Sequence, residues 1–120
     1  MKKIICVDFD GVIHSYVNGW HGAHVISDPP VDGAFEWLMS LVYDNRFDVC
    51  IYSSRSKEDG GIQAMCDWFT KYGLDFDVLK EIKFPTQKPA AFLTIDDRAL
   101  TFTGIFPTKE QMLSFKPWNK

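Results

Sequence analysis

Residues 7–12, Val-Asp-Phe-Asp-Gly-Val, constrain the fold of this 120-residue chain more than any other stretch. They overlap the end of an apolar run at residues 4–7, which is typical of a strand buried on both faces. Asp8 and Asp10 lie two positions apart, so in an extended segment their side chains point to the same side. Like charges that close need a compensating cation or a shifted pKa. The pattern predicts a buried strand that ends in a charged site, with a turn at Gly11.

A second pair of carboxylates follows another apolar run. Residues 90–95 are predicted to form a strand, and Asp96 and Asp97 come directly after it. Between the two pairs, residues 47–53 predict another buried strand and residues 76–79 a short one. Because parallel strands of an α/β sheet place their carboxyl ends at one edge, we expect the two acidic pairs to share a divalent cation site.

Helical patterns alternate with these strands. Apolar side chains three and four residues apart predict helices that open at Pro29-Pro30 and near Gly61. Residues 101–105 suit a last strand, and residues 108–115 a closing helix. The hydrophobic content of 46% supports one real core, and no linker divides the chain. We therefore expect a single α/β domain over residues 1–120.

Residues 13–27, between the first strand and the first helix, are predicted to form a short β-hairpin flap over the site. Asn18-Gly19 is a hairpin turn signal with aromatic residues on either side. The histidines His14, His21 and His24 lie on a polar, glycine-containing loop without the i, i+4 spacing of a helical metal site. We expect them to face solvent or substrate.

Charge and apolar runs limit the partners. The net charge is −3 and no run of Lys or Arg occurs, which disfavours nucleic acid as a tightly held partner but leaves a small oligonucleotide substrate open. The first apolar run is too short for a signal peptide, and no run would span a membrane. Cys6, Cys50 and Cys66 have no disulfide or zinc spacing, so we expect reduced, packed thiols. These features predict a cytoplasmic protein without a membrane partner.

Hydroxyl and basic groups complete the candidate site. Ser53, Ser54 and Arg55 end the second predicted strand, where a hydroxyl can donate to an anionic oxygen held by the first strand's loop. Arg55 is expected either to contact substrate or to form a structural ion pair. Lys88 lies in a segment rich in Lys and Pro just before the strand at residues 90–95.

These motifs resemble those of the haloacid dehalogenase (HAD) superfamily of phosphohydrolases. Asp8-Phe-Asp10-Gly-Val, a strand-ending Ser53, Lys88, and Asp96-Asp97 after a strand occur in the order of the four HAD motifs, and the resemblance covers residues 3–104. It implies a HAD-like, Rossmann-like parallel sheet of about five strands in the order 3-2-1-4-5, with helices on both faces. The stretches between the motifs are too short for the cap domain of larger members, so no cap domain is expected.

The resemblance also implies a reaction, hydrolysis of a phosphate monoester with Mg²⁺ as cofactor. Asp8 would be the nucleophile, forming an aspartyl-phosphate, and a metal ligand. Asp10 would protonate the leaving alcohol and later take a proton from the attacking water, while its backbone carbonyl completes the metal shell.

The other motif residues would hold phosphate and metal. Ser53 and Lys88 would bind the phosphoryl oxygens. Ser54 and Arg55, beside Ser53, are candidate substrate contacts, with a structural ion pair as the alternative for Arg55. Asp96, and Asp97 through water, would bind Mg²⁺. The implied partner is a phosphorylated small molecule or the phosphorylated end of a macromolecule.

The sequence is also compatible with two other classes of function. A phospho-acceptor signalling domain also combines an acidic pair, another Asp, a hydroxyl and a lysine, but in receiver domains the acidic pair lies on the first strand and the lysine follows the last. A HAD-like fold that binds partners without turnover is the other, and the intact Asp10 argues against it.

Overall fold

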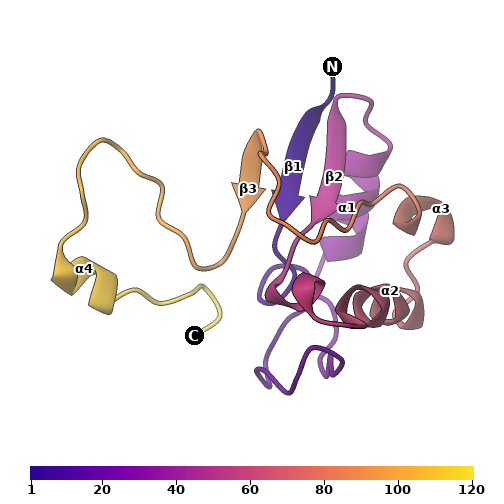
Figure 1. The fold of residues 1–120 in the computed structure, drawn as a ribbon, viewed down its shortest axis with the longest axis horizontal. Helices are drawn as coiled ribbons and strands as arrows, with labels where there is room; N and C mark the ends of the chain where they lie inside the picture. Colours follow the sequence, from indigo (N-terminus) through magenta and orange to yellow (C-terminus); the bar gives the residue numbers. More distant parts are fainter.

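Three parallel strands form the centre of the computed structural model, which describes residues 1–120 (Figure 1). The strands are β1 (Lys3–Val7), β2 (Phe47–Ile51) and β3 (Leu93–Ile95), in the order β2-β1-β3. The register pairs Val7 with Ile51 on one side and with Ile95 on the other. All three strands therefore end level, and the residues that follow them emerge at one edge of the sheet.

The helices account for most of the remaining regular structure. They are α1 (Ala34–Val42), α2 (Gly61–Lys71), α3 (Phe76–Leu79) and α4 (Lys109–Leu113), together with a short 3-10 helix, η1 (Ser54–Lys57). Helices predicted after the two prolines, near Gly61 and at the end of the chain are thus confirmed, although α1 begins at Ala34 rather than at the prolines. None of the helices has the length and apolarity that crossing a membrane requires.

The core lies between the sheet and the helices α1, α2 and α3. It contains 15 buried apolar residues. Phe9 packs edge-on against the rings of Trp68 and Phe69 of α2, with ring centroids 5.0 and 5.8 Å apart. Residues just after β1 are therefore held by α2, which fixes the loop that carries the first acidic pair.

Helices on both faces of the sheet are not found. In Figure 1, α1 lies behind the sheet, and the loop between α3 and β3 passes in front of it. Helix α4 has no buried residue and lies apart from the strands. The loop has Pro85 and Pro89, which suit a covering segment without a helix.

The prediction of a third strand at residues 76–79 is wrong, because this segment forms α3. Asp75 caps the helix by accepting a hydrogen bond from the backbone N–H of Asp77 at 2.8 Å. The buried side chains of Val78, Leu79 and Ile82 follow a helical spacing. A window of four residues was too short to show this spacing.

A single residue takes the place of that predicted strand beside β2. Lys83 donates a backbone hydrogen bond to Val49 at 3.0 Å and accepts one from Ile51 at 2.9 Å. Pro85 follows two positions later and has no N–H to continue the ladder. The sheet therefore has three strands instead of about five.

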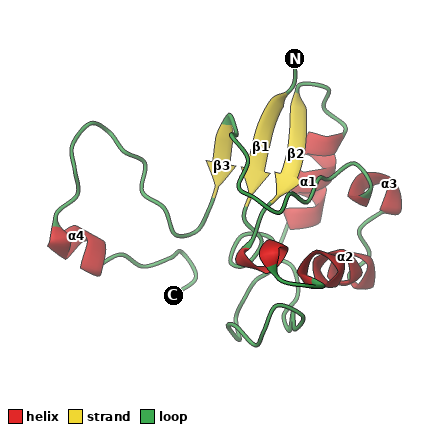
Figure 2. Ribbon diagram, in the orientation of Figure 1, coloured by secondary structure: helices red, strands yellow, loops and turns green.

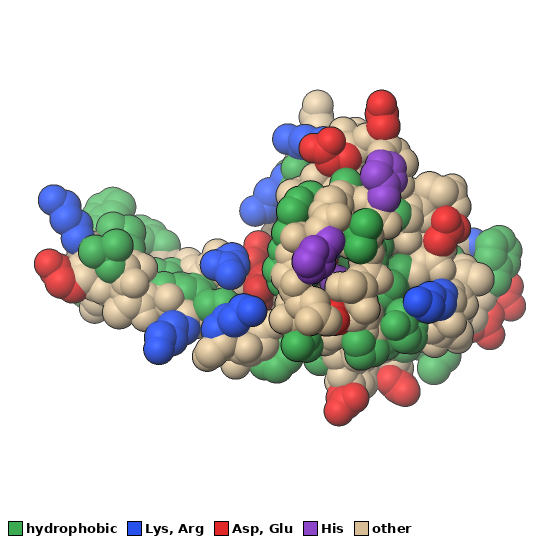
Figure 3. Space-filling model, turned by 90° about the horizontal axis from the view of Figure 1, so that it is seen from below, with side chains coloured by type: hydrophobic (Ala, Val, Ile, Leu, Met, Phe, Trp, Pro, Cys, Tyr) green, Lys and Arg blue, Asp and Glu red, His purple; other side chains and the backbone are tan.

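The predicted last strand at residues 101–105 is also wrong. It belongs to a C-terminal arm, residues 98–117, which is irregular apart from α4 (Figure 2). Gly104 has φ +99°, which breaks an extended conformation, and Phe102 and Ile105 are 60% and 80% exposed. Figure 3 shows this arm projecting from the body of the molecule with basic and apolar side chains along it. The chain returns at Trp118, whose indole N–H donates to the Gly11 carbonyl at 2.7 Å.

The flap exists as an irregular loop and not as a β-hairpin. One antiparallel bridge, His14 to Pro30, closes its base. The carboxylate of Asp28, the residue just after the flap, accepts from the backbone N–H of Asn18 within it at 2.9 Å. Side chains thus satisfy backbone groups that a hairpin would pair across two strands.

Candidate active site

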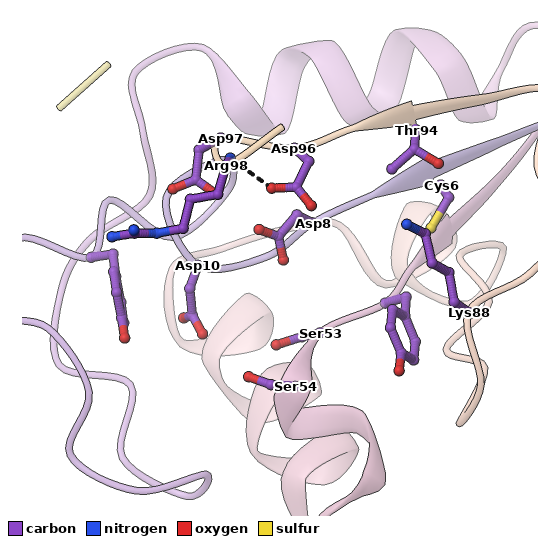
Figure 4. Close-up of a pocket in the computed structure, with 12 residues that line it drawn as sticks. Cys6, Asp8, Asp10, Ser53, Ser54, Lys88, Thr94, Asp96, Asp97 and Arg98 are labelled. Atoms are coloured by element: carbon purple, nitrogen blue, oxygen red, sulfur yellow. Dashed lines mark hydrogen bonds between the residues drawn. The ribbon is translucent and has the colours of Figure 1, made fainter. Parts of the chain in front are cut away.

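A cavity of about 330 Å³ opens at the carboxyl ends of the three strands (Figure 4). Of the eight site residues predicted from the sequence, seven line it: Asp8, Asp10, Ser53, Ser54, Lys88, Asp96 and Asp97. They come from stretches far apart in the chain, brought together by the parallel order of the strands. The eighth, Arg55, does not line the cavity and is fully buried behind it.

Three carboxylates form the closest group in the cavity. Each of Asp8, Asp96 and Asp97 offers a carboxylate oxygen, and these oxygens all lie within 4.8 Å of one another. The pairing of β1 with β3 continues for one residue past the strands, because the Asp8 N–H donates to the Ile95 carbonyl at 2.9 Å. This bond sets the first acidic pair beside the second.

Gly11 permits the close approach of Asp97. Its φ is +84°, a value that other residues rarely adopt, which confirms the turn predicted there. A Cβ at this position would lie 2.2 Å from Asp97 Oδ2. Any larger residue would therefore displace the Asp97 carboxylate from its place beside Asp8 and Asp96.

Burial raises the pKa of Asp8 to about 8, and the negative charges of Asp96 and Asp97 nearby add to the effect. A hydrogen bond from the Phe9 N–H, at 2.8 Å, acts in the opposite direction but is weaker. The site therefore holds an excess of negative charge that a bound cation would neutralise.

The donor set fits Mg²⁺. Hard divalent cations take oxygen ligands, and Asp8, Asp96 and Asp97 supply only carboxylate oxygens, close enough to converge on one ion. No buried cysteine or histidine joins the group, which would have favoured a softer metal. A bound metal ion would compensate the negative charges of Asp96 and Asp97, which add to the effect of burial on the pKa of Asp8.

We predict that the metal-free protein loses stability as pH rises from about 4 to about 8. Between its ordinary pKa of 3.8 and its folded pKa of about 8, Asp8 binds more protons in the folded state than in the unfolded state. Raising pH across this window therefore favours unfolding. Thermal unfolding in EDTA should show a falling midpoint, and Asp8→Asn should flatten the profile.

The matched control for this experiment is Asp32→Asn, which removes an exposed carboxylate that makes no hydrogen bond. Millimolar Mg²⁺ should raise the wild-type midpoint at pH 8, since binding to the folded state at 100 times Kd contributes about 2.7 kcal/mol. Parallel pH profiles for wild type and Asp8→Asn, with no effect of Mg²⁺, would contradict this account.

Ser53 faces the acidic residues across the cavity. It is 2% exposed and precedes η1, where its hydroxyl oxygen accepts a hydrogen bond from the Arg55 backbone N–H at 3.1 Å. Its own N–H donates to Ser56 Oγ at 3.0 Å, which closes a capping box. The hydroxyl hydrogen of Ser53 is therefore left to donate into the cavity.

Lys88 and Ser54 are exposed, as is Asp96 among the carboxylates. In Figure 4, Lys88 lies on the Cys6 side of the cavity, away from Asp10. Both residues line the same cavity as the carboxylates, so an anion seated there would meet a cation and a second hydroxyl.

Asp10 is held by two side chains that the structure buries completely. Arg55 Nε donates to Asp10 Oδ1 and Oδ2 at 3.2 and 3.1 Å, and Nη2 donates to Oδ1 at 3.1 Å. His14 Nδ1 lies 2.9 Å from the same Oδ1. The expectation that His14 faces solvent or substrate is wrong, whereas His21 and His24 are exposed. The i, i+4 spacing of Asp10 and His14 was the signal that could have identified this contact.

Tyr16 and Arg98 also line the cavity and were not identified from the sequence. Tyr16 has φ +60°, which is uncommon for a tyrosine and marks a constrained point in the flap. The Arg98 N–H donates to Asp96 Oδ1 at 2.8 Å, and this fixes the turn after β3 (Figure 4). The Asp96-Asp97-Arg98 triplet was visible, but nothing in it indicated that the arginine borders the site.

Comparison with protein-family models, with curated proteins and with solved structures gave no significant match.

Proposed function

We propose that this protein is a Mg²⁺-dependent phosphatase that hydrolyses a phosphate monoester through an aspartyl-phosphate. The observation that carries the proposal is the convergence, around one cavity, of a carboxylate triad with a second aspartate, a buried serine and a lysine. This is the set of groups that phosphoryl transfer to a carboxylate requires. The strand order β2-β1-β3 supports the proposal, because β3 lies where the fourth strand of the implied order 3-2-1-4-5 was expected. The three observed strands thus match the central 2-1-4 part of that order.

Each residue in the proposal has a role that its surroundings support. Asp8, at the end of the central strand, is the nucleophile. Ser53 donates its free hydroxyl hydrogen to a phosphoryl oxygen, and Lys88 supplies a positive charge to another. Asp96 and Asp97, with Asp8, hold Mg²⁺, which supplies charge neutralisation at the phosphoryl oxygens when bound.

Asp10 is the general acid and base. It stands two residues after Asp8, lines the same cavity, and 12% of its side chain is exposed there. It would give a proton to the leaving alcohol as the bond from phosphorus to that oxygen breaks. It would then take a proton from the water that hydrolyses the aspartyl-phosphate. The presence of this second carboxylate in the cavity favours turnover over a long-lived phosphorylated state.

The test is release of inorganic phosphate from a panel of monoesters, with Mg²⁺ or with EDTA. The panel comprises p-nitrophenyl phosphate, an alkyl phosphate, a phosphopeptide and a 3′-phosphorylated oligonucleotide. We expect turnover of at least one ester, with the rate falling by roughly 100-fold or more in EDTA. No phosphate release from any of them, or the same rate in EDTA, would contradict the proposal.

A further inference from the structure

The Arg55 side chain joins Asp10 to the flap. Its guanidinium is 0% exposed and lies in an ion pair with Asp10, Nε to Oδ2 at 3.1 Å. On its far side, Nη1 donates to the backbone carbonyls of Gly22, Ala23 and Val25 at 2.9, 3.0 and 3.1 Å. All three guanidinium nitrogens are thus engaged inside the protein, and none is directed at substrate.

Trp20 covers this ion pair from the flap. Its ring lies over the guanidinium, 4.6 Å from Arg55 Cζ to the centroid. The indole is itself 47% exposed, so it separates the buried arginine from solvent. An arginine buried this way keeps its place only while both the carboxylate and the flap carbonyls accept its hydrogen bonds.

The same contacts orient the Asp10 carboxylate. Oδ1 accepts from Arg55 Nε and Nη2 and lies 2.9 Å from His14 Nδ1. His14 Nε2 accepts from the Asp28 N–H at 3.1 Å, which leaves the ring hydrogen on Nδ1 to be donated to Asp10. Oδ2 accepts from Arg55 Nε alone. Oδ2 therefore keeps a lone pair for the cavity, whereas Oδ1 is saturated.

We propose that Arg55 is a positioning residue, which aligns Asp10 for proton transfer through Oδ2 and makes that alignment depend on the closed flap. The inference rests on the phosphatase function proposed above. If the flap opened, Nη1 would lose its hydrogen bonds to all three carbonyls. The guanidinium would then leave its buried position to be hydrated, and the Asp10 carboxylate would be free to rotate. Closure of the flap therefore fixes the orientation of the Asp10 carboxylate, in addition to shielding the site.

Hydrogen exchange of the flap tests the coupling without any need for activity. Asp10→Ala and Arg55→Lys should each speed amide exchange in residues 16–27 by roughly tenfold or more, because a lysine cannot make both sets of contacts. Asp8→Ala is the matched control. It removes another carboxylate of the same cavity, and this carboxylate makes no hydrogen bond with Arg55. Unchanged flap exchange in both Asp10→Ala and Arg55→Lys would overturn the inference.

Kinetics separate positioning from substrate binding. In Arg55→Lys we expect kcat to fall by roughly tenfold to 100-fold, the cost of a misplaced acid–base group, with KM changed less than about twofold. The loss should be larger for an alkyl phosphate than for p-nitrophenyl phosphate, whose leaving group needs no proton. A raised KM with equal losses for both esters would show that Arg55 contacts substrate instead.

Two further variants keep these outcomes distinct. Trp20→Ala alters an exposed side chain, so it decides the question if Arg55→Lys does not fold, and it should change exchange and kcat in the same direction by a smaller factor. Arg46→Lys alters an exposed ion pair with Asp44 and should leave both unchanged. If the wild type hydrolyses no ester, the phosphatase proposal fails, and flap exchange alone still decides whether Arg55 couples the flap to Asp10.

Discussion

Asp8→Asn is expected to lower kcat for every phosphate monoester by roughly 10⁴-fold or more. An amide cannot form the acyl phosphate, and removing a nucleophile from a covalent mechanism has effects of this size. The same change removes a buried carboxyl whose pKa is raised to about 8. We therefore expect the metal-free variant to be more stable than wild type at pH 8 and yet inactive, which separates loss of chemistry from loss of fold.

The measurement pairs steady-state phosphate release with thermal unfolding in EDTA. Asp32→Asn serves as the control for removing one negative charge at the surface. Wild-type turnover in Asp8→Asn would show that another group attacks phosphorus. Loss of turnover together with a collapse in stability would mean that Asp8 supports the fold and not the reaction.

Asp10→Asn is expected to turn over slowly and to accumulate phosphorylated protein. The nucleophile stays in place, so an ester with a good leaving group still transfers its phosphoryl group to Asp8. The group that activates water for the second step is missing, and general base catalysis contributes about 10²- to 10⁴-fold. Rapid quenching after mixing with p-nitrophenyl phosphate, followed by intact-mass measurement, should show a gain of one phosphoryl group.

Asp97→Asn is the matched control, because it changes another carboxylate of the same cavity that is not placed in proton transfer. It should raise the Mg²⁺ concentration that turnover requires, without accumulating phosphorylated protein. If Asp10→Asn accumulated none either, and kept wild-type turnover, Asp10 would not be the acid and base.

The site could be predicted where its residues directly follow strands, although β3 is mostly exposed and only β1 and β2 are buried at their ends. Asp8 and Asp96 follow apolar runs, and parallel pairing of β1 with β3 brings the ends of such runs together whatever lies between them. The turn at Gly11 followed from the same short stretch. Local patterns were sufficient because strand ends and glycine turns are local properties.

Features that depend on distant contacts were not predictable. Arg55 reaches Asp10 across 45 positions of the chain, and the three carbonyls that hold it come from a loop without any periodic pattern. His14 is buried where the rings of Phe9, Tyr16 and Trp68 pack against its own ring. A polar loop in the sequence gave no sign of this enclosure.

The predictions of the two outer strands were wrong for a related reason. Residues 76–79 are mostly apolar, which fits a short strand. They form a helix because Asp75 caps its N-terminus and because Val78 and Leu79 are buried on one side of it. Residues 101–105 have strand-forming side chains and no partner strand in the structure. Strand propensity reflects packing against neighbours, so it decides little at the edge of a sheet.

Identification of the residue that carries the phosphoryl group tests the central claim most directly. Wild type and Asp10→Asn would be quenched during turnover of p-nitrophenyl phosphate with Mg²⁺, reduced with borohydride, which converts an aspartyl-phosphate to homoserine, and digested for peptide mass measurement. We predict homoserine at position 8 and at no other aspartate. A phosphoryl group on Ser53, or turnover without any covalent phosphoryl group, would contradict the assignment of Asp8 as the nucleophile.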